Sequence, residues 1–324
     1  MNTESAATVV QTSGLTKRYA SGVTAVSGLD LRIATGEIYG FVGRNGAGKT
    51  TTMRMLVGLI RPSAGSALLL GRPLGDPATL ARVGSLIESP AFQPHLSGLE
   101  NLRLLARYLG LPDGEVDRVL GQVQLVPEAA ARKFRTYSLG MKQRLGVAAA
   151  LLGDPELLIL DEPTNGLDPA GMAAMRDLLR SLAAQGRTVL LSSHLLAEVE
   201  QICDRVGILH EGRLKAEGTV AEIQAHLGGG VTTVTVRVEQ PDTALACLRG
   251  LPDLGEVRTA GDLVEIDTDG ARAVEINRAL VLAGAGVSEL VTKRRSLEEA
   301  FLGLTQAPDA AGIEAPPAAL EGVS

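Results

Sequence analysis

Hydrophobic positions change their spacing several times near the start of the chain, and each change marks a predicted element. Residues up to about 20 carry alternating apolar positions and predict a first strand, and Leu29, Leu31 and Ile33 alternate in a second. The apolar run Glu37–Val42 leads directly into a glycine-rich segment, and apolar residues in Thr50–Ile60 then follow helical spacing. The pattern predicts a strand, a glycine-rich loop and a helix in that order.

The middle of the chain combines helical patterns with short buried strands. Apolar residues recur at helical spacing through residues 95–153, which predicts mainly helices. Leu157–Leu160 is apolar throughout and does not alternate, as expected for a strand buried on both faces. A helix at about 170–185, a strand at Thr188–Ser192, a short helix and a strand at Val206–Leu209 are predicted to follow. This succession predicts an α/β fold.

A different pattern begins after the triple glycine Gly228–Gly230, which predicts a linker. Val231–Val238 alternates strongly, and the following segments predict the order β-α-β-β-α-β of a small ferredoxin-like unit, with a last helix at Ser296–Leu304. Residues 307–324 are rich in Ala, Pro and Gly and are predicted to be disordered. The predicted organisation is an N-terminal domain at 1–227 with a helical subdomain at about 90–153, an accessory α+β domain at 228–306 and a tail at 307–324.

Composition argues against several classes of protein. The chain has 324 residues, 45% of them apolar, and its net charge of −6 does not resemble the basic footprint of a nucleic-acid-binding protein. Cys203 and Cys247 are far apart and form no CxxC motif, which argues against a disulfide framework or a zinc site and fits a reducing cytoplasm. Neither a signal peptide nor an apolar run of about 18 residues is apparent. We therefore expect any action at a membrane to require another polypeptide.

A phosphate-binding loop is predicted at Gly43–Thr50, where GRNGAGKT satisfies the pattern G-x-x-x-x-G-K-[ST]. Glycines let the backbone turn its N–H groups toward phosphates, and the helix that follows adds the positive end of its dipole. Lys49 is expected to reach the β and γ phosphates, and Thr50 to offer its hydroxyl to Mg²⁺. The alternative is a simple glycine-rich turn before a helix. The candidate nucleotide-binding residues are Gly43, Arg44, Asn45, Gly46, Ala47, Gly48, Lys49, Thr50 and Thr51.

Two acidic residues follow the predicted strand Leu157–Leu160. Ligands of open parallel sheets bind at the carboxyl ends of the strands, where Asp161 and Glu162 are expected to lie. Asp161 suits a contact with Mg²⁺, and Glu162 is placed to polarise an attacking water. A strand that ends in a charged turn is the alternative when the pair is taken alone. Together with the glycine-rich loop, the two acids predict ATP hydrolysis.

Three further segments complete a set of motifs in one order along the chain. They are YSLGMKQR at Tyr137–Arg144, the sequence NGLD at Asn165–Asp168, and LLSSH at Leu190–His194. With the loop and the acidic pair, they resemble the nucleotide-binding subunits of ATP-binding-cassette (ABC) transporters over about residues 8–226. The resemblance implies an ABC-type P-loop NTPase domain with a mixed sheet core and a helical subdomain, and ATP and Mg²⁺ as cofactors.

The resemblance also implies roles for single residues. Ser138, Gly140 and Asp168 match segments that act on the ATP held by the other copy in a head-to-tail dimer. Tyr19 matches an aromatic that stacks on adenine, and His194 matches a histidine that contacts the γ-phosphate, which makes His194 a catalytic candidate beside Glu162. The alternatives are that Tyr19 is a core residue, that His194 is structural and that Ser138 is only a helix N-cap.

Three positions depart from the pattern of the family. Leu139 replaces the first signature glycine and Met141 replaces the usual glutamine, and both changes resemble active variants in drug and bacteriocin exporters. Glu88 occupies the position of a magnesium-binding glutamine and resembles the lantibiotic-immunity and bacitracin-resistance branch. Glu88 is therefore a candidate metal ligand together with Thr50 and Asp161. The alternative is that Glu88 is an ordinary loop carboxylate.

The expected function is an ATP-hydrolysing subunit that powers a separate transmembrane permease, with export of an antibiotic, a peptide or another amphipathic compound as cargo. The subunit is expected to form a homodimer or to pair with a second nucleotide-binding subunit, without a nucleic-acid partner, on the cytoplasmic face of the cell membrane. The alternatives are a non-transport ABC ATPase, a regulatory module that binds ATP without turnover, and a GTPase or small-molecule kinase. The chain lacks the second cassette, long coiled coil or N-K-x-D motif that some of these would carry.

Overall fold

The computed structural model describes residues 7–88, 91–228, 231–252, 254–269 and 272–294. They form two compact units, which divide between Thr219 and Val220. The predicted boundary after residue 227 lies at the other end of helix α9 (Val220–Gly228). The predicted last helix and the predicted tail lie outside the described residues. Within the described residues, no helix combines the length and the hydrophobicity that crossing a bilayer requires.

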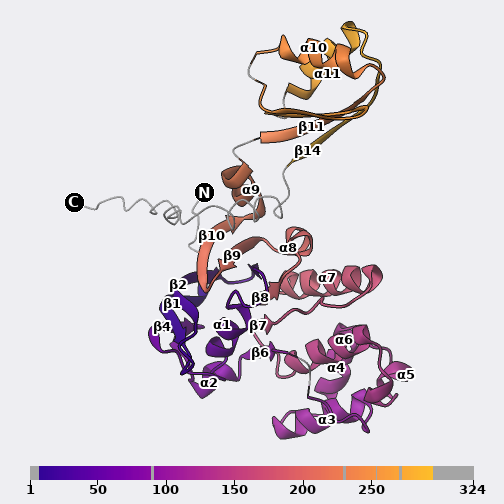
Figure 1. The fold of residues 1–324 in the computed structure, drawn as a ribbon. Coiled ribbons are helices and arrows are strands. Elements are labelled where there is room, and N and C mark those ends of the chain that lie inside the picture. Colours follow the sequence, from indigo (N-terminus) through magenta and orange to yellow (C-terminus); the bar gives the residue numbers. More distant parts are fainter. Residues whose placement is uncertain (1–6, 89–90, 229–230, 253, 270–271, 295–324) are drawn as a thin grey trace, which may run out of the picture. The chain divides into compact units, whose positions relative to one another are not determined.

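The first unit is built on a six-stranded sheet with the order β10-β9-β3-β8-β7-β6 (Figure 1). Strand β10 runs antiparallel to β9, and all other neighbouring strands of this sheet are parallel. Every residue of β3, β7 and β8 is buried, which explains why their apolar runs do not alternate. The strands are β3 (Ile38–Val42), β6 (Val83–Leu86), β7 (Leu157–Leu160), β8 (Thr188–Ser193), β9 (Arg205–His210) and β10 (Arg213–Thr219).

A second, antiparallel sheet has the order β2-β1-β4-β5. One hydrophobic cluster contains residues of both sheets and of α1 (Lys49–Leu56), among them Leu15, Phe41, Met53 and Ile159. Because α1 contributes to this shared core, the loop before it is held in a fixed place. The strands of the second sheet are β1 (Thr8–Arg18), β2 (Thr24–Ala34), β4 (Ala64–Leu69) and β5 (Arg72–Pro73).

The predicted helical subdomain forms between β6 and β7 and lies at one end of the first unit (Figure 1). Its first long helix begins with a capping box, in which Ser97 and Glu100 each accept a hydrogen bond from the other's backbone N–H. The subdomain contains α3 (Gly98–Tyr108), α4 (Gly114–Gln122), α5 (Pro127–Ala130), a short 3₁₀ helix (Phe134–Thr136) and α6 (Leu139–Ala150). The remaining helices of the unit are α2 (Pro77–Leu80), α7 (Pro169–Ala184) and α8 (Leu196–Ile202).

The second unit confirms the predicted element order and the ferredoxin-like fold. Its four strands form an antiparallel sheet with the order β12-β13-β11-β14, so the second and third strands lie on one side of the first, and the fourth on its other side. Val234, Ile266, Leu248 and Ile276 join the sheet and both helices in one core. The elements are β11 (Val231–Val238), α10 (Pro241–Arg249), β12 (Val257–Ala260), β13 (Leu263–Asp269), α11 (Ala273–Leu282) and β14 (Val287–Arg294).

Candidate functional site

The glycine-rich loop lies between the end of β3 and the start of α1, as the sequence predicts. Gly46 and Gly48 have φ values of 86° and 105°, which residues with a Cβ rarely adopt. A Cβ at Gly48 would lie 2.5 Å from the Ala25 carbonyl oxygen, and a Cβ at Gly43 would lie 2.4 Å from the Leu209 carbonyl oxygen. Glycine is therefore required at both positions because neighbouring backbone leaves no room for a side chain.

A cavity of about 760 Å³ opens beside this loop. Its volume falls within the range of small-molecule and cofactor sites. The sequence predicted the loop, Glu162 and His194, but it did not single out the segment before the loop or the β9–β10 turn, which come near only through folding. The lining comprises Arg44–Thr51, Glu162, Asn165 and His194, together with Val23–Ala25 and Glu211.

Lys49 is buried at the bottom of the loop, with 6% of its side chain exposed. Its ammonium group donates to the Gly43 carbonyl oxygen at 2.5 Å and lies 3.2 Å from Glu162 Oε1. A buried ammonium needs such partners because desolvation of an unpaired charge is costly. The positive charge is therefore fixed within the loop, where the motif predicts phosphate binding.

Asp161 is held by hydroxyl groups from two other elements. Thr50 Oγ1 donates to Asp161 Oδ2 at 2.7 Å, and Ser192 Oγ donates to Asp161 Oδ1 at 2.5 Å. The Ser192 hydroxyl also accepts from the Glu162 backbone N–H at 2.9 Å. Ser192 thus orients both acidic residues, a role that was not predicted from its place in the LLSSH segment.

The Glu162 carboxylate contacts two other candidate residues of the site, Lys49 and His194. Its Oε1 faces Lys49, and its Oε2 lies 2.7 Å from His194 Nδ1. The Glu162 backbone has a φ of 49°, a left-handed conformation that is sparsely populated by residues other than glycine and is common at functional sites. The side chain stands on the wall of the cavity because β7 ends directly before it.

Tyr19 and Glu88 are among the predicted residues that lie outside the cavity lining. Tyr19 follows β1, is 37% exposed and carries the Lys17 ammonium 5.4 Å from its ring centroid. Its exposure does not fit the alternative of a core residue. Glu88 has a φ of 66°, and its carboxylate pairs with Arg54. The structure therefore brings neither residue together with the phosphate loop.

The signature segment, Tyr137–Arg144, and the NGLD loop, Asn165–Asp168, lie against each other. Ser138 is the N-cap of α6, and its Oγ accepts from Met141 N at 3.3 Å, while Asp168 caps α7 in the same way through Gly171 N at 3.0 Å. A Cβ at Gly166 would lie 2.7 Å from Leu139 Cδ2, so the two segments are in contact.

Ser138 and Asp168 are exposed and Gly140 is half-buried, and none of the three lines the cavity. Asn165, at the start of the same loop, does line it. The NGLD loop therefore extends from the cavity to the exposed start of α6, where the N-cap of each helix, Ser138 and Asp168, is exposed.

The sheet, the glycine-rich loop and the acidic strand end define a nucleotide-binding domain of the P-loop class. A family model described as ABC transporter matches residues 26–165. The bacitracin transport ATP-binding protein BcrA of Bacillus licheniformis is 38% identical over 92% of this chain and 97% of its own length. The daunorubicin resistance ATP-binding protein DrrA3 of Streptomyces coeruleorubidus is 38% identical over 92% of this chain and 96% of its own.

Solved structures agree with this assignment. An ATP-binding subunit of an ABC transporter superposes with a TM-score of 0.61 at 32% identity, covering 68% of this chain and 93% of its own. A dimeric bacterial ABC transporter cassette has a TM-score of 0.60 at 24% identity over 65% of this chain and 98% of its own, and supports the fold alone. The chain belongs to the ATP-binding subunits of ABC transporters, and its activity is ATP hydrolysis for transport.

Proposed function

We propose that the chain holds ATP and Mg²⁺ in the cavity beside the glycine-rich loop and hydrolyses the ATP when a second cassette covers that cavity. The proposal rests on one arrangement: the cavity contains the loop, Glu162 and His194, while Ser138 and Gly140 lie on a separate surface. One chain therefore carries two different half-sites. A head-to-tail pair of cassettes would join the cavity of each copy to the signature segment of the other.

Thr50 and Asp161 are the residues that would hold Mg²⁺. Their side-chain oxygens are 2.7 Å apart, and hydroxyl and carboxylate oxygens suit this cation. Among the described residues, no group of three or more His, Cys, Asp or Glu side chains is arranged to hold a metal. This fits Mg²⁺, which usually takes one or two protein ligands and completes its shell with phosphate and water. When bound, Mg²⁺ neutralises charge on the phosphates.

ATP binding would change the partners of Glu162. The carboxylate is engaged by Lys49 through one oxygen and by His194 through the other. A triphosphate offers both residues a more highly charged partner, so Lys49 would turn to the β and γ phosphates and His194 to the γ-phosphate. Glu162 would then be free to accept a proton from the attacking water. We propose Glu162 as the general base and His194 as its catalytic partner.

The remaining predicted contacts belong to the closed dimer. Ser138 and Gly140 would meet the γ-phosphate of the partner, because the N-terminus of α6 adds its dipole to the Ser138 hydroxyl. Asp168 would lie at the same interface, and Tyr19 would stack on adenine at the rim of its own cavity. Glu88 would join the metal ligands only after its ion pair with Arg54 opens.

The work of the dimer is proposed to be export of an antibiotic, a peptide or another amphipathic compound through a separate permease. Cassettes of this family dimerise and pair with a membrane permease. The names of the relatives BcrA and DrrA3 associate them with bacitracin transport and daunorubicin resistance. By this proposal the chain acts at the cytoplasmic face of the membrane, as a homodimer or beside a second nucleotide-binding subunit, and without nucleic acid.

Two experiments test the proposal. Glu162→Gln should keep ATP binding, abolish steady-state phosphate release and accumulate an ATP-bound dimer on a sizing column. A variant that stays monomeric with saturating ATP and Mg²⁺ would refute the shared site.

For the cargo, a strain that lacks the chain should become sensitive to bacitracin or daunorubicin and regain resistance with the wild-type chain but not with Lys49→Ala. Unchanged sensitivity to both compounds would remove this cargo class.

A further inference from the structure

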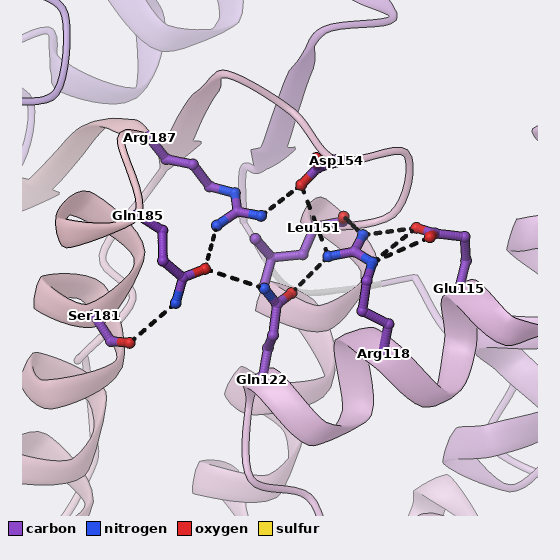
Figure 2. Close-up of polar contacts among 8 residues, drawn as sticks. All are labelled: Glu115, Arg118, Gln122, Leu151, Asp154, Ser181, Gln185 and Arg187. Atoms are coloured by element: carbon purple, nitrogen blue, oxygen red, sulfur yellow. Dashed lines mark hydrogen bonds and ion pairs between the residues drawn. The ribbon is translucent and has the colours of Figure 1, made fainter.

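A polar network joins the helical subdomain to the end of α7 (Figure 2). Arg118, on α4, pairs with Glu115 at 2.6 Å and donates to Gln122 Oε1 at 2.9 Å and to the Leu151 carbonyl oxygen at 3.1 Å. Gln122 Nε2 in turn lies 3.4 Å from Gln185 Oε1, just beyond α7. The network thus connects α4 and the end of α6 with the part of the fold that carries β7 and β8.

Asp154 is the residue that ties the two sides together. It lies in the loop between α6 and β7, where Oδ1 accepts from Arg187 Nη2 at 2.5 Å and lies 3.8 Å from Arg118 Nη1. Only 11% of the Arg187 side chain is exposed, and Asp154 is the one carboxylate that it contacts among the described residues. The Asp154 charge is therefore the main compensation for a largely buried guanidinium.

The backbone of Asp154 adopts a strained conformation. Its φ is 54°, in the left-handed region, although Pro155 follows directly and favours an extended residue before it. Such a conformation persists only where surrounding interactions hold it. The Asp154 backbone N–H donates to the Leu151 carbonyl oxygen at 3.2 Å, and the two arginines face the Asp154 carboxylate, so the loop between α6 and β7 has a defined shape.

The elements that meet at this network carry the proposed ATP contacts at their other ends. α6 ends at Ala150 and begins beside Ser138, which is its N-cap. β7 begins at Leu157 and leads to Asp161, while β8 begins directly after Arg187 and leads to Ser192, which orients both acidic residues. A tilt of α6 at its end would therefore displace the signature serine relative to the acidic residues.

We propose that Asp154 is a positioning residue, which sets the angle between α6 and the sheet and so aligns Ser138 for the ATP of the partner. The inference rests on the proposed shared site. Asp154 touches neither the cavity nor any nucleotide-binding candidate, so its loss should leave ATP binding to a single chain intact and weaken closure of the pair.

The expected effect follows from the number of networks in a dimer. The Asp154–Arg187 pair is already formed in the single chain, so it acts on dimerisation only through the alignment of α6. A partly exposed ion pair contributes a few tenths to about 1 kcal/mol, so the loss of that alignment costs closure roughly threefold in an equilibrium constant for each copy. Because a dimer closes with two such networks, the two factors multiply to about tenfold in the dimer dissociation constant.

The test uses the full chain in the Glu162→Gln background, which blocks turnover. Sedimentation with saturating ATP and Mg²⁺ gives the dimer dissociation constant, and a fluorescent ATP analogue gives single-chain affinity at protein concentrations below dimerisation. Asp154→Asn removes the charge but keeps a residue that tolerates the left-handed backbone. Asp154→Glu keeps the charge at a cost in backbone strain. Glu115→Gln is the matched control, because Glu115 pairs with Arg118 without reaching Arg187.

The expected result is that Asp154→Asn weakens the dimer about tenfold, that Asp154→Glu and Glu115→Gln change it less than about threefold, and that affinity for the analogue is unchanged in all of them. Because Asp154→Glu lowers the stability of folding and retains the charge, it separates alignment from stability. The inference is overturned if Asp154→Asn dimerises like its parent, if Asp154→Glu weakens the dimer as much, or if analogue affinity falls. A Glu162→Gln parent that never dimerises refutes the proposed shared site itself, and the inference with it.

Discussion

Replacing Ser192 with alanine offers a sharp test of how the acidic residues are held. The Ser192 side chain is fully buried, donates to Asp161 Oδ1 at 2.5 Å and accepts from Glu162 N at 2.9 Å. Alanine fits the same space and removes both hydrogen bonds. The hydrogen bond to the Asp161 carboxylate has a charged acceptor and contributes about 1.5–3 kcal/mol to stability. Loss of the other hydrogen bond leaves the Glu162 backbone N–H unpaired, which costs about 1–3 kcal/mol. We expect a loss of about 3 kcal/mol in the free energy of unfolding after partial relaxation.

Activity should fall more than stability alone explains, because the same hydroxyl fixes Asp161 and Glu162. Misplacement that costs about 1.4–2.8 kcal/mol of transition-state stabilisation lowers kcat by about 10- to 100-fold. Phosphate release would be measured at a temperature where urea titration shows the variant to be folded. Ser193→Ala is the control, since the Ser193 hydroxyl accepts from Leu195 N at 2.9 Å and touches neither acid. An Ser192→Ala protein with wild-type kcat and unfolding free energy would refute the reasoning.

Two further predictions concern packing and capping. In Gly84→Ala, the new Cβ would lie 1.9 Å from the Ala150 carbonyl oxygen. The variant should therefore lose about 3 kcal/mol or more in the free energy of unfolding, measured by urea titration. An unchanged urea midpoint would contradict the contact between β6 and α6. The Ser97 backbone N–H lowers the pKa of Glu100 below its ordinary value, so this carboxylate stabilises α3 above pH 4.5, and the contribution is lost as pH falls through the lowered pKa. Glu100→Gln should therefore lower the melting temperature at pH 7, and the difference from the wild type should shrink as the pH falls through the lowered pKa, whereas an equal loss throughout an acid titration would contradict the assignment.

Much of the fold could be read from the sequence where one pattern dominates. The fully apolar run Leu157–Leu160 and the alternating run Val231–Val238 became strands as predicted. The strand β6 was not predicted, because VGSL is short and contains glycine and serine, and its pairing with β7 comes from tertiary contacts. Strand β10 was missed because its residues are only half-buried at the edge of the sheet.

In the candidate site, too, residues whose roles depend on tertiary contacts could not be predicted from the sequence. A motif fixes residues that are close in sequence, so the loop around Lys49 and the pair Asp161 and Glu162 were predictable. Ser192 acts through a side chain buried between two elements, and its partners are about 30 residues away in sequence, a separation that periodicity cannot interpret. Glu88 was assigned from its alignment with a family position, and its pairing with Arg54 depends on the local fold of its loop.

The central claim is that each ATP is shared between two copies of the chain, and mixing two inactive variants tests it most directly. Lys49→Ala disables the phosphate loop, and Ser138→Arg disables the signature segment. A mixed dimer of the two contains one fully intact site and one site with both defects. Phosphate release should rise on mixing to roughly one quarter of the wild-type rate, since half of the dimers are mixed and each has one intact site of two. A mixture that is no more active than the two variants measured separately would contradict the shared site.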